Sequence, residues 1–247
     1  MELKTLDIFC EIIDNYGDIG VVYRIAKELD KIFPNSKIRV FLNRLEEFKK
    51  INSQVKDTPC QIIDGIEYIT FDYVQKKAKE LSTSQVIIEA FGCKIPDEYM
   101  EIAYGNSELL INLEYLSAED WIEDFHLQSS PLGKEKLKKV FFMPGFTEKS
   151  GGIIADSNYL ERIEKVIKNR DFYTKKYLGN IENRDKKIVG TLFSYEKNFT
   201  TLFEELKKLD REVVILAMGE KTQESLKKFF EKKLIEDFRN SLKYGKI

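Results

Sequence analysis

The sequence predicts an α/β protein with parallel sheets, and two observations carry this prediction. Short apolar segments rich in valine, isoleucine and phenylalanine alternate along the chain with segments of helical periodicity, which is the pattern of successive β–α–β units. The chain has 247 residues, of which 43% are hydrophobic, so it is long enough to bury one or two cores. We therefore expect parallel sheets with helices on both faces.

The expected strands are apolar segments bounded by turn or helix signals. The first, residues 5–13, leads into a helical pattern over residues 19–33, which ends before Pro34 because the residue before a proline disfavours helical geometry. The other strands are expected at residues 37–42, 61–71, 86–91, 109–113, 140–143, 188–194 and 213–218. The other helices are expected at residues 44–52, 73–81, 97–103, 118–125, 158–169, 199–209 and 222–242. Right-handed crossovers then place the loops that follow the strands on one rim of the sheet.

A glycine-rich stretch marks a boundary between two units. Pro144-Gly145 and Gly151-Gly152 relieve backbone constraint there, and a helical stretch and a new strand follow. We expect an N-terminal Rossmann-like domain over residues 1–150 and a partial C-terminal Rossmann-like domain over residues 151–247. The second domain is incomplete in this prediction because it offers only about two strands, where sheets usually contain about four to six.

Composition argues against several classes of function. The net charge is −2 and the pI is near 5.8, so we expect no nucleic-acid partner. No apolar run approaches the ~20 residues that a membrane-spanning helix requires, and the start of the chain lacks the basic and apolar regions of a signal peptide. The three cysteines are widely spaced and His126 is the single histidine. We therefore expect a cytoplasmic protein without a membrane anchor or a metal site.

The loop that follows the first strand is the main candidate site, because open α/β sheets bind ligands at such strand-to-helix junctions. It reads DNYGDIG at residues 14–20. In a structural interpretation, Asp18 is the N-cap of the following helix and Asp14 forms a local turn. In a functional interpretation, both acids converge on a cationic group, Gly17 and Gly20 let a ligand approach the backbone, and the helix N-terminus favours an anion. The two glycines do not match the dinucleotide-binding fingerprint.

Polar residues also occur where later strands end. Glu89 lies in a strand that we expect to be buried. A carboxylate is costly there without a partner, so we expect it to be salt-bridged or to lie at the rim. Asn112 and Glu114 alternate with Leu113, which indicates that both polar side chains face the rim.

The segment after Glu114 carries three further expectations. Ser117, with Asp120 in place of the usual Glu or Gln, resembles the start of a helix cap. We expect Trp121 to be a packing anchor. We expect His126 to be a hydrogen-bonded structural residue and not a catalyst.

An aromatic pair lies at the end of the first strand of the second unit. Phe193 and Tyr195 flank Ser194 there, and aromatic rings at a strand's carboxyl end can stack on a base or a sugar. The alternative is that Phe193 belongs to the core and Tyr195 to the ordinary surface. The residues by themselves leave both interpretations open.

Several of these stretches together resemble the EarP family, the protein-arginine rhamnosyltransferases of bacterial elongation factor P. The matching words are DIFC at residues 7–10, IDNYGDIGV at 13–21, IEAFGC at 88–93, NLEYLSAE at 112–119 and PGF at 144–146. They follow the family's order and spacing, and they cover nearly the whole first unit. The resemblance implies a GT-B-like fold, in which two Rossmann-like domains face each other across a cleft.

The resemblance also implies a reaction: rhamnose moves from dTDP-β-L-rhamnose to an arginine of elongation factor P, with inversion. It implies that Asp14 and Asp18 are catalytic, with Asp18 as the general base and Asp14 orienting the guanidinium. The expected donor-binding residues are Gly17, Gly20, Phe193 and Tyr195, and the acceptor-side candidates are Asn15, Tyr16, Glu89 and Glu114. No metal and no cofactor are expected, because this fold commonly stabilises the leaving group through helix dipoles and side chains.

The sequence departs from the family in its second domain, and this leaves alternative functions open. The family's second domain is longer and carries an Arg-Gly-Glu-Asp-Ser-like word for the donor's diphosphate, which does not occur in this sequence. We therefore expect the chain to be a truncated member. The alternatives are a fragment that binds elongation factor P without turnover, or another nucleotide-sugar transferase of the same fold.

Overall fold

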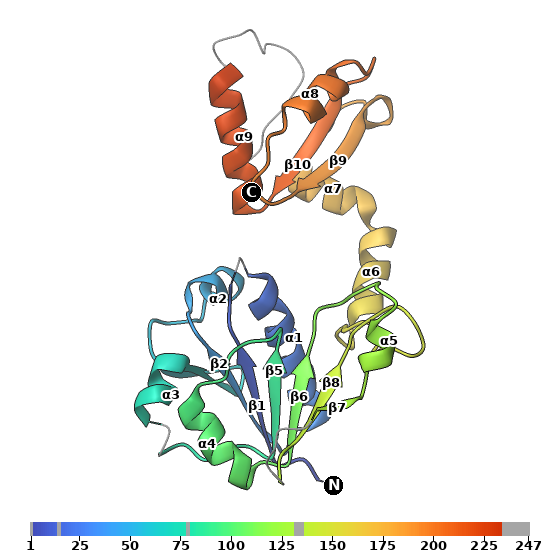
Figure 1. Cartoon of the computed structure of the whole chain (residues 1–247). Helices are drawn as coiled ribbons and strands as arrows, with labels where there is room; N and C mark the ends of the chain where they lie inside the picture. Colours follow the sequence, from blue (N-terminus) through green and yellow to red (C-terminus); the bar gives the residue numbers. More distant parts are fainter. Residues whose placement is uncertain (1, 14–15, 78–79, 131–135, 234–247) are drawn as a thin grey trace. The chain divides into compact units, whose positions relative to one another are not determined.

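The computed structural model divides the chain into two compact units, Met1–Tyr159 and Leu160–Ile247 (Figure 1). It describes residues 2–13, 16–77, 80–130 and 136–233. The predicted boundary at residue 150 lies inside the first unit, because the segment beyond it is tied to the first helix. Arg24 Nη1 donates to the Ile154 carbonyl over 3.3 Å, and the Ser157 backbone N–H donates to the Glu28 carboxylate over 3.1 Å.

The first unit is built on one sheet with the strand order β3-β4-β2-β1-β5-β6-β8-β7. The strands from β4 to β8 in this order run parallel, and the edge strands β3 and β7 are antiparallel to their neighbours. The mainly parallel sheet confirms the predicted fold class. The strands are β1 (Thr5–Cys10), β2 (Lys37–Leu42), β3 (Cys60–Ile63), β4 (Ile66–Thr70), β5 (Val86–Ala90), β6 (Leu109–Leu113), β7 (Ser129–Ser130) and β8 (Lys138–Phe142).

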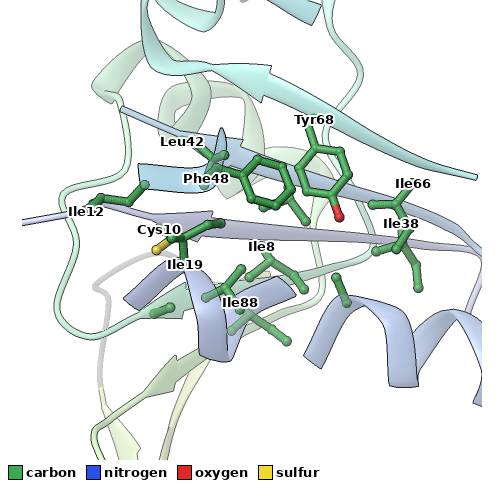
Figure 2. Close-up of a cluster of buried hydrophobic side chains, with 14 of the residues drawn as sticks. Ile8, Cys10, Ile12, Ile19, Ile38, Leu42, Phe48, Ile66, Tyr68 and Ile88 are labelled. Carbon is green, nitrogen blue, oxygen red and sulfur yellow. The ribbon is translucent and has the colours of Figure 1, made fainter. Parts of the chain in front are cut away.

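Helices cover both faces of this sheet because alternate strand residues point to opposite sides. Within β1, Ile8 belongs to one buried cluster and Phe9 to the other. The first cluster includes Ile19, Val22 and Ala26 of α1, whose spacing is that of a helix face. Figure 2 shows Ile19 among the strand residues of this cluster. The second cluster includes side chains of α3 and α4. The helices of this unit are α1 (Gly17–Ile32), α2 (Glu46–Ile51), α3 (Phe71–Lys77), α4 (Asp97–Asn106) and α5 (Ile122–Phe125).

A charged pair is buried beneath α4. Arg39 on β2 donates from Nε to Asp7 Oδ1 over 2.7 Å and from Nη2 to Asp7 Oδ2 over 2.6 Å, and both residues are almost fully buried. The Tyr99 hydroxyl also donates to Asp7, and the Ser82 carbonyl accepts from Arg39 over 2.6 Å. The charges are therefore paired and hydrogen-bonded, as buried ionised groups must be.

Two predicted elements differ from the structure, and a further helix was not predicted. The single strand predicted over residues 61–71 is wrong: β3 and β4 form a hairpin there. Asp64 and Gly65 turn the chain with φ angles of 53° and 84°, since two-residue hairpin turns favour positive φ. The helix predicted over residues 118–125 is reduced to α5, and the sequence prediction missed α7 (Arg170–Leu178).

The second unit contains a two-stranded parallel sheet, β9 (Ile188–Phe193) and β10 (Val213–Met218). Helices α8 (Thr200–Lys207) and α9 (Glu220–Lys233) supply much of its core, which includes Phe203 and Leu226. The helix α6 (Tyr159–Lys168) begins where the units divide. The helix predicted over residues 222–242 corresponds to α9, which begins at Glu220, and the predicted end at residue 242 lies outside the described residues.

The strand order places one topological switch point in the first unit. The chain moves from β1 outward to β2 and β4, then returns to place β5 on the other side of β1. Ligands of open α/β sheets bind at the carboxyl edge of the strands that flank such a point. Within the described residues, no helix is long and apolar enough to cross a membrane.

Candidate active site

Asp18 lies at this switch point, in the first turn of α1. The carboxylate is buried, with 7% of the residue exposed, and its Oδ2 accepts the backbone N–H of Ile13 over 3.3 Å. The predicted N-cap role of Asp18 is wrong, because α1 begins at Gly17 and its N-cap position is Tyr16, without a side-chain cap. Asp18 therefore faces back toward the end of β1, while α1 continues away from the site.

Tyr115 forms a hydrogen bond with the other carboxylate oxygen of Asp18. Its hydroxyl donates to Asp18 Oδ1 over 2.9 Å, and its ring stacks on Phe91 with centroids 4.3 Å apart and planes inclined by 11°. Partial desolvation, together with the hydrogen bond to Asp18, raises the pKa of Tyr115 well above the ordinary value for tyrosine. The hydroxyl thus remains a protonated donor at neutral pH. The sequence analysis gave no role to Tyr115 or Phe91.

The backbone that enters the site is held by side chains that directly follow β2. The Asn43 amide accepts the Ile12 N–H over 2.9 Å and donates to the Ile12 carbonyl over 3.2 Å. Arg44 Nη2 donates to the Ile13 carbonyl over 2.8 Å. The sequence analysis missed both residues. Their position directly after a strand parallel to β1 is the signal that could have identified them.

The other predicted residues of the first loop contribute in different ways. Asp14 and Asn15 lie outside the described residues. Tyr16 is partly buried and packs against the first core cluster. Gly17 is exposed, and a Cβ added there would meet nothing within 4 Å. At Gly20 an added Cβ would lie 3.6 Å from Ile51 Cδ1 on α2, which is ordinary van der Waals contact.

Glu89 on β5 is paired, as one interpretation of the sequence predicts. Its Oε2 lies 2.8 Å from Nζ of Lys139 on β8, and both side chains are less than one-fifth exposed. Glu114 directly follows β6 and is partly buried, and its backbone N–H donates to the Phe142 carbonyl over 3.0 Å. Asn112 does not lie on an exposed rim as predicted: it lies within β6, and only 4% of the residue is exposed.

Around α5, two of the sequence predictions are wrong and one is confirmed. The Ser117 hydroxyl accepts the Glu119 N–H over 3.1 Å, so Ser117 closes a local turn and does not cap α5. Trp121 is 51% exposed, and its ring meets that of Phe125 edge-on with centroids 5.8 Å apart. The prediction that Trp121 is a packing anchor is therefore wrong. His126 Nδ1 accepts the Met143 N–H over 3.1 Å, which confirms its structural role.

In the second unit, Phe193 and Tyr195 are both more than 60% exposed at the carboxyl end of β9. The core interpretation of Phe193 is therefore wrong. The Lys221 ammonium lies 5.2 Å from the Tyr195 ring centroid, within the range of a cation–π contact. Gly219 has a φ of +85°, and a Cβ there would come within 2.8 Å of the Phe193 ring. Glycine is thus required beside this aromatic pair.

The second unit also contains a pocket of about 510 Å³, whose lining begins at Glu196, directly after Tyr195 in the sequence. It is lined by residues of the loop after β9, the start of α8 and one face of α9. Lys228 and Glu196 form an ion pair of 2.5 Å at its edge, and Ser225 accepts the Lys197 N–H over 3.2 Å. The lining therefore combines these charged and polar groups with the rings of Phe199 and Phe229.

The three cysteines differ in environment. Burial raises the pKa of Cys93 to about 12 and raises that of Cys10 further, so both thiols remain protonated near neutral pH. Cys60 lies on the exposed face of β3. In the part of the chain that the structure describes, no group of three or more His, Cys, Asp or Glu side chains is arranged to hold a metal ion.

Comparison with known proteins identifies the family. The family model described as "Elongation-Factor P (EF-P) rhamnosyltransferase EarP" matches residues 6–246. The chain is 36% identical over 163 residues to a protein-arginine rhamnosyltransferase of Pseudomonas aeruginosa, covering 65% of this chain and 42% of that protein. It is 34% identical over 202 residues to the protein of that name in Shewanella oneidensis, covering 77% of this chain and 50% of that protein.

The chain thus spans about half the length of the curated relatives that it matches. Among solved structures, a UDP-GlcNAc 2-epimerase from Methanocaldococcus jannaschii aligns with a TM-score of 0.42 and 12% identity, over 97% of this chain and 72% of that one. That likeness is too distant to support any inference about this chain. The match of the family model over residues 6–246 is decisive, and this chain belongs to the EarP family of elongation factor P rhamnosyltransferases.

Proposed function

We propose that this chain carries the acceptor side of an enzyme that transfers rhamnose from dTDP-β-L-rhamnose to an arginine of elongation factor P, with inversion of the anomeric carbon. The observation that carries the proposal is the family match over residues 6–246. The position of Asp18 at the switch point of the first unit supports it, because that is where such sheets bind their ligands.

The chemistry requires a carboxylate at this position. A guanidinium is delocalised and stays protonated at ordinary pH, so its nitrogen is a poor nucleophile. A carboxylate can orient it through paired hydrogen bonds and accept its proton. In the proposed step, one guanidinium nitrogen forms a bond to the anomeric carbon and the bond from that carbon to dTDP breaks. The displaced proton moves to Asp18, and the nucleotide leaves as an anion.

The remaining residues take supporting roles in this proposal. Asp14 orients the guanidinium, a role that comes from the family resemblance alone. Glu114 is a better acceptor-side carboxylate than Glu89, because the ion pair with Lys139 already neutralises Glu89. The exposed rings of Phe193 and Tyr195 are suited to stack on the donor's base or sugar. The proposal assigns no metal ion and no cofactor.

Mass spectrometry of elongation factor P tests the proposal. The acceptor protein is incubated with this chain and dTDP-rhamnose, and its intact mass and arginine-containing peptides are measured. A gain of one deoxyhexose on a single arginine is the expected result. A matched control uses elongation factor P in which that arginine is replaced by lysine, which keeps the charge and removes the guanidinium.

Two other outcomes separate the alternatives. Complex formation without any gain in mass identifies a module that binds elongation factor P without turnover. Rhamnose transfer to a small molecule, with elongation factor P neither bound nor modified, identifies another nucleotide-sugar transferase. Absence of binding and of transfer contradicts the proposed function for this chain.

A further inference from the structure

One side-chain contact at the site joins segments that lie 97 positions apart in the sequence. The Tyr115 hydroxyl, in the segment after β6, donates to Asp18 Oδ1 at the start of α1 over 2.9 Å. The other oxygen of Asp18 accepts the Ile13 N–H over 3.3 Å. Among the described residues, each carboxylate oxygen of Asp18 accepts one hydrogen bond, and a carboxylate oxygen has the capacity to accept a second.

Tyr115 is only partly buried, with 51% of the residue exposed, but the backbone on both sides of it is hydrogen-bonded. On either side of it, the Glu114 N–H donates to the Phe142 carbonyl over 3.0 Å and the Ser117 N–H donates to the Pro144 carbonyl over 3.2 Å. These bonds extend the pairing of β6 with β8 past the ends of the strands. The backbone that carries the tyrosine is thus fixed to the sheet.

The ring of Tyr115 rests on a residue with an unusual backbone. Phe91 has a φ of +59°, which is uncommon for a bulky residue. Its N–H donates to the Leu113 carbonyl over 2.7 Å, and its ring lies 4.3 Å from that of Tyr115. Backbone conformations of this kind persist where surrounding contacts enforce them, and they cluster at functional sites. Here the conformation supports the tyrosine that contacts Asp18.

We propose that Tyr115 is a positioning residue for Asp18, whose carboxylate it keeps in one orientation toward the cationic group that enters the site. This inference rests on the proposed function only for the identity of that group, the guanidinium of the acceptor arginine. The raised pKa of Tyr115 is consistent with it, since a phenol that stays protonated remains a donor. The hydroxyl orients the base, and the proton of the reaction passes to Asp18.

A simpler role for Tyr115 is packing against Phe91. The substitution Tyr115→Phe separates the two roles, because it keeps the ring stack and removes only the hydroxyl. If the tyrosine only packs, this variant binds and reacts like the wild type. If it positions Asp18, the effect of the variant depends on the Asp18 carboxylate, and a double-mutant cycle measures that dependence.

The first measurement needs no ligand. The chain is labelled with [¹³Cζ]tyrosine, and the phenol signals are followed by NMR as the pH is raised. We expect the Tyr115 signal, assigned by its loss in Tyr115→Phe, to titrate above pH 10. In Asp18→Asn we expect it to titrate about one unit lower, because a charged acceptor has been removed. An unchanged titration would show that the contact does not form in solution and would overturn the proposal.

The second measurement is the affinity of the chain for elongation factor P by calorimetry. We expect Tyr115→Phe to weaken binding about tenfold and to have no further effect in the Asp18→Asn background. Tyr23→Phe is the matched control. Tyr23 also lies on α1, and the substitution removes a hydroxyl that donates to Asp64 over 3.1 Å. We expect it to leave the affinity unchanged.

Two results in this cycle would overturn the proposal. One is an equal loss of affinity from Tyr115→Phe in the wild-type and Asp18→Asn backgrounds. The other is a loss of the same size in Tyr23→Phe, which would indicate a general structural effect. If the wild-type chain does not bind elongation factor P, the proposed function fails instead, and the tyrosine titration alone decides the positioning role.

Discussion

At the scale of single residues, the proposed chemistry depends on Asp18. In Asp18→Asn, the amide oxygen can still accept the hydrogen bond of Tyr115, but the side chain can no longer take a proton. We expect transfer to elongation factor P to fall by about 10²- to 10⁴-fold, while the thermal unfolding temperature changes little. Near-normal turnover would contradict the base assignment, and loss of the folded state would show that the carboxylate is needed for structure.

The buried pair of Asp7 and Arg39 has a structural role that a second substitution tests. Arg39→Leu leaves the Asp7 carboxylate buried without its partner, so we expect the free energy of unfolding to fall by about 3–5 kcal/mol. Urea denaturation at neutral pH measures this change. The matched control is Lys27→Met, which breaks the exposed pair with Asp64 and should cost less than about 1 kcal/mol. Equal losses in the two variants would contradict the argument from burial.

At the scale of elements, the β3–β4 hairpin depends on its turn. Gly65 has a φ of +84°, so we expect Gly65→Ala to destabilise the protein by about 1–2 kcal/mol. Gly105→Ala is the matched control. Gly105 lies in α4, and a Cβ there meets nothing within 4 Å, so alanine should stabilise the protein by about 0.5–1 kcal/mol. Denaturation midpoints give both values, and changes of the same sign would contradict the argument.

Sequence patterns alone are sufficient to predict the bounds of some strands. The bounds predicted for β2, β6 and β10 match the structure, because each is a short apolar run bounded by polar or turn residues. The prediction of one strand over residues 61–71 fails because Asp64-Gly65 interrupts a nearly continuous β pattern by only two residues. A turn of that length reverses the chain direction without a visible change in periodicity.

At the scale of the whole molecule, the sequence predicts where the site lies but not which distant side chains meet there. The strand-to-helix junction and its acid could be inferred because a loop after the first strand of an α/β sheet falls at the carboxyl edge. Tyr115 and Phe91 could not be assigned, because their roles arise only when β1, β5 and β6 become neighbours. Asn43 differs from these two residues, because its position directly after β2 can be inferred from the sequence; its contact with Ile12 joins the segments that follow β1 and β2.

Acid should weaken the whole fold through its paired carboxylates. Burial alone would raise the pKa of Glu67, but the ion pair with Lys37 and the hydrogen bond from Cys60 lower it below 4.5. A lowered folded-state pKa stabilises the protein above the unfolded-state value, and this contribution is lost as the pH falls through the folded-state value. The pKa values of Glu28 and Glu196 are lowered as well, because their carboxylates accept hydrogen bonds from Lys31 and Lys228.

We therefore expect the urea midpoint of unfolding to be lower at about pH 3 than at pH 7. Glu67→Gln should show a smaller difference between the two pH values, because it cannot be protonated. A midpoint that is independent of pH over this range would contradict the prediction. The comparison of the variant with the wild type separates the contribution of Glu67 from that of other carboxylates.

The burial of two thiols also makes the protein convenient to label. A maleimide dye reacts with exposed thiolates, so the native chain should take up one equivalent, at Cys60, while Cys10 and Cys93 react only after unfolding. Partial desolvation and the hydrogen bond to Glu67 raise the pKa of Cys60, so labelling should be faster at mildly alkaline pH. Mass spectrometry of the native and denatured chains checks the count. A fluorophore attached there reports from the edge strand of the hairpin, far along the sheet order from β5 and β6.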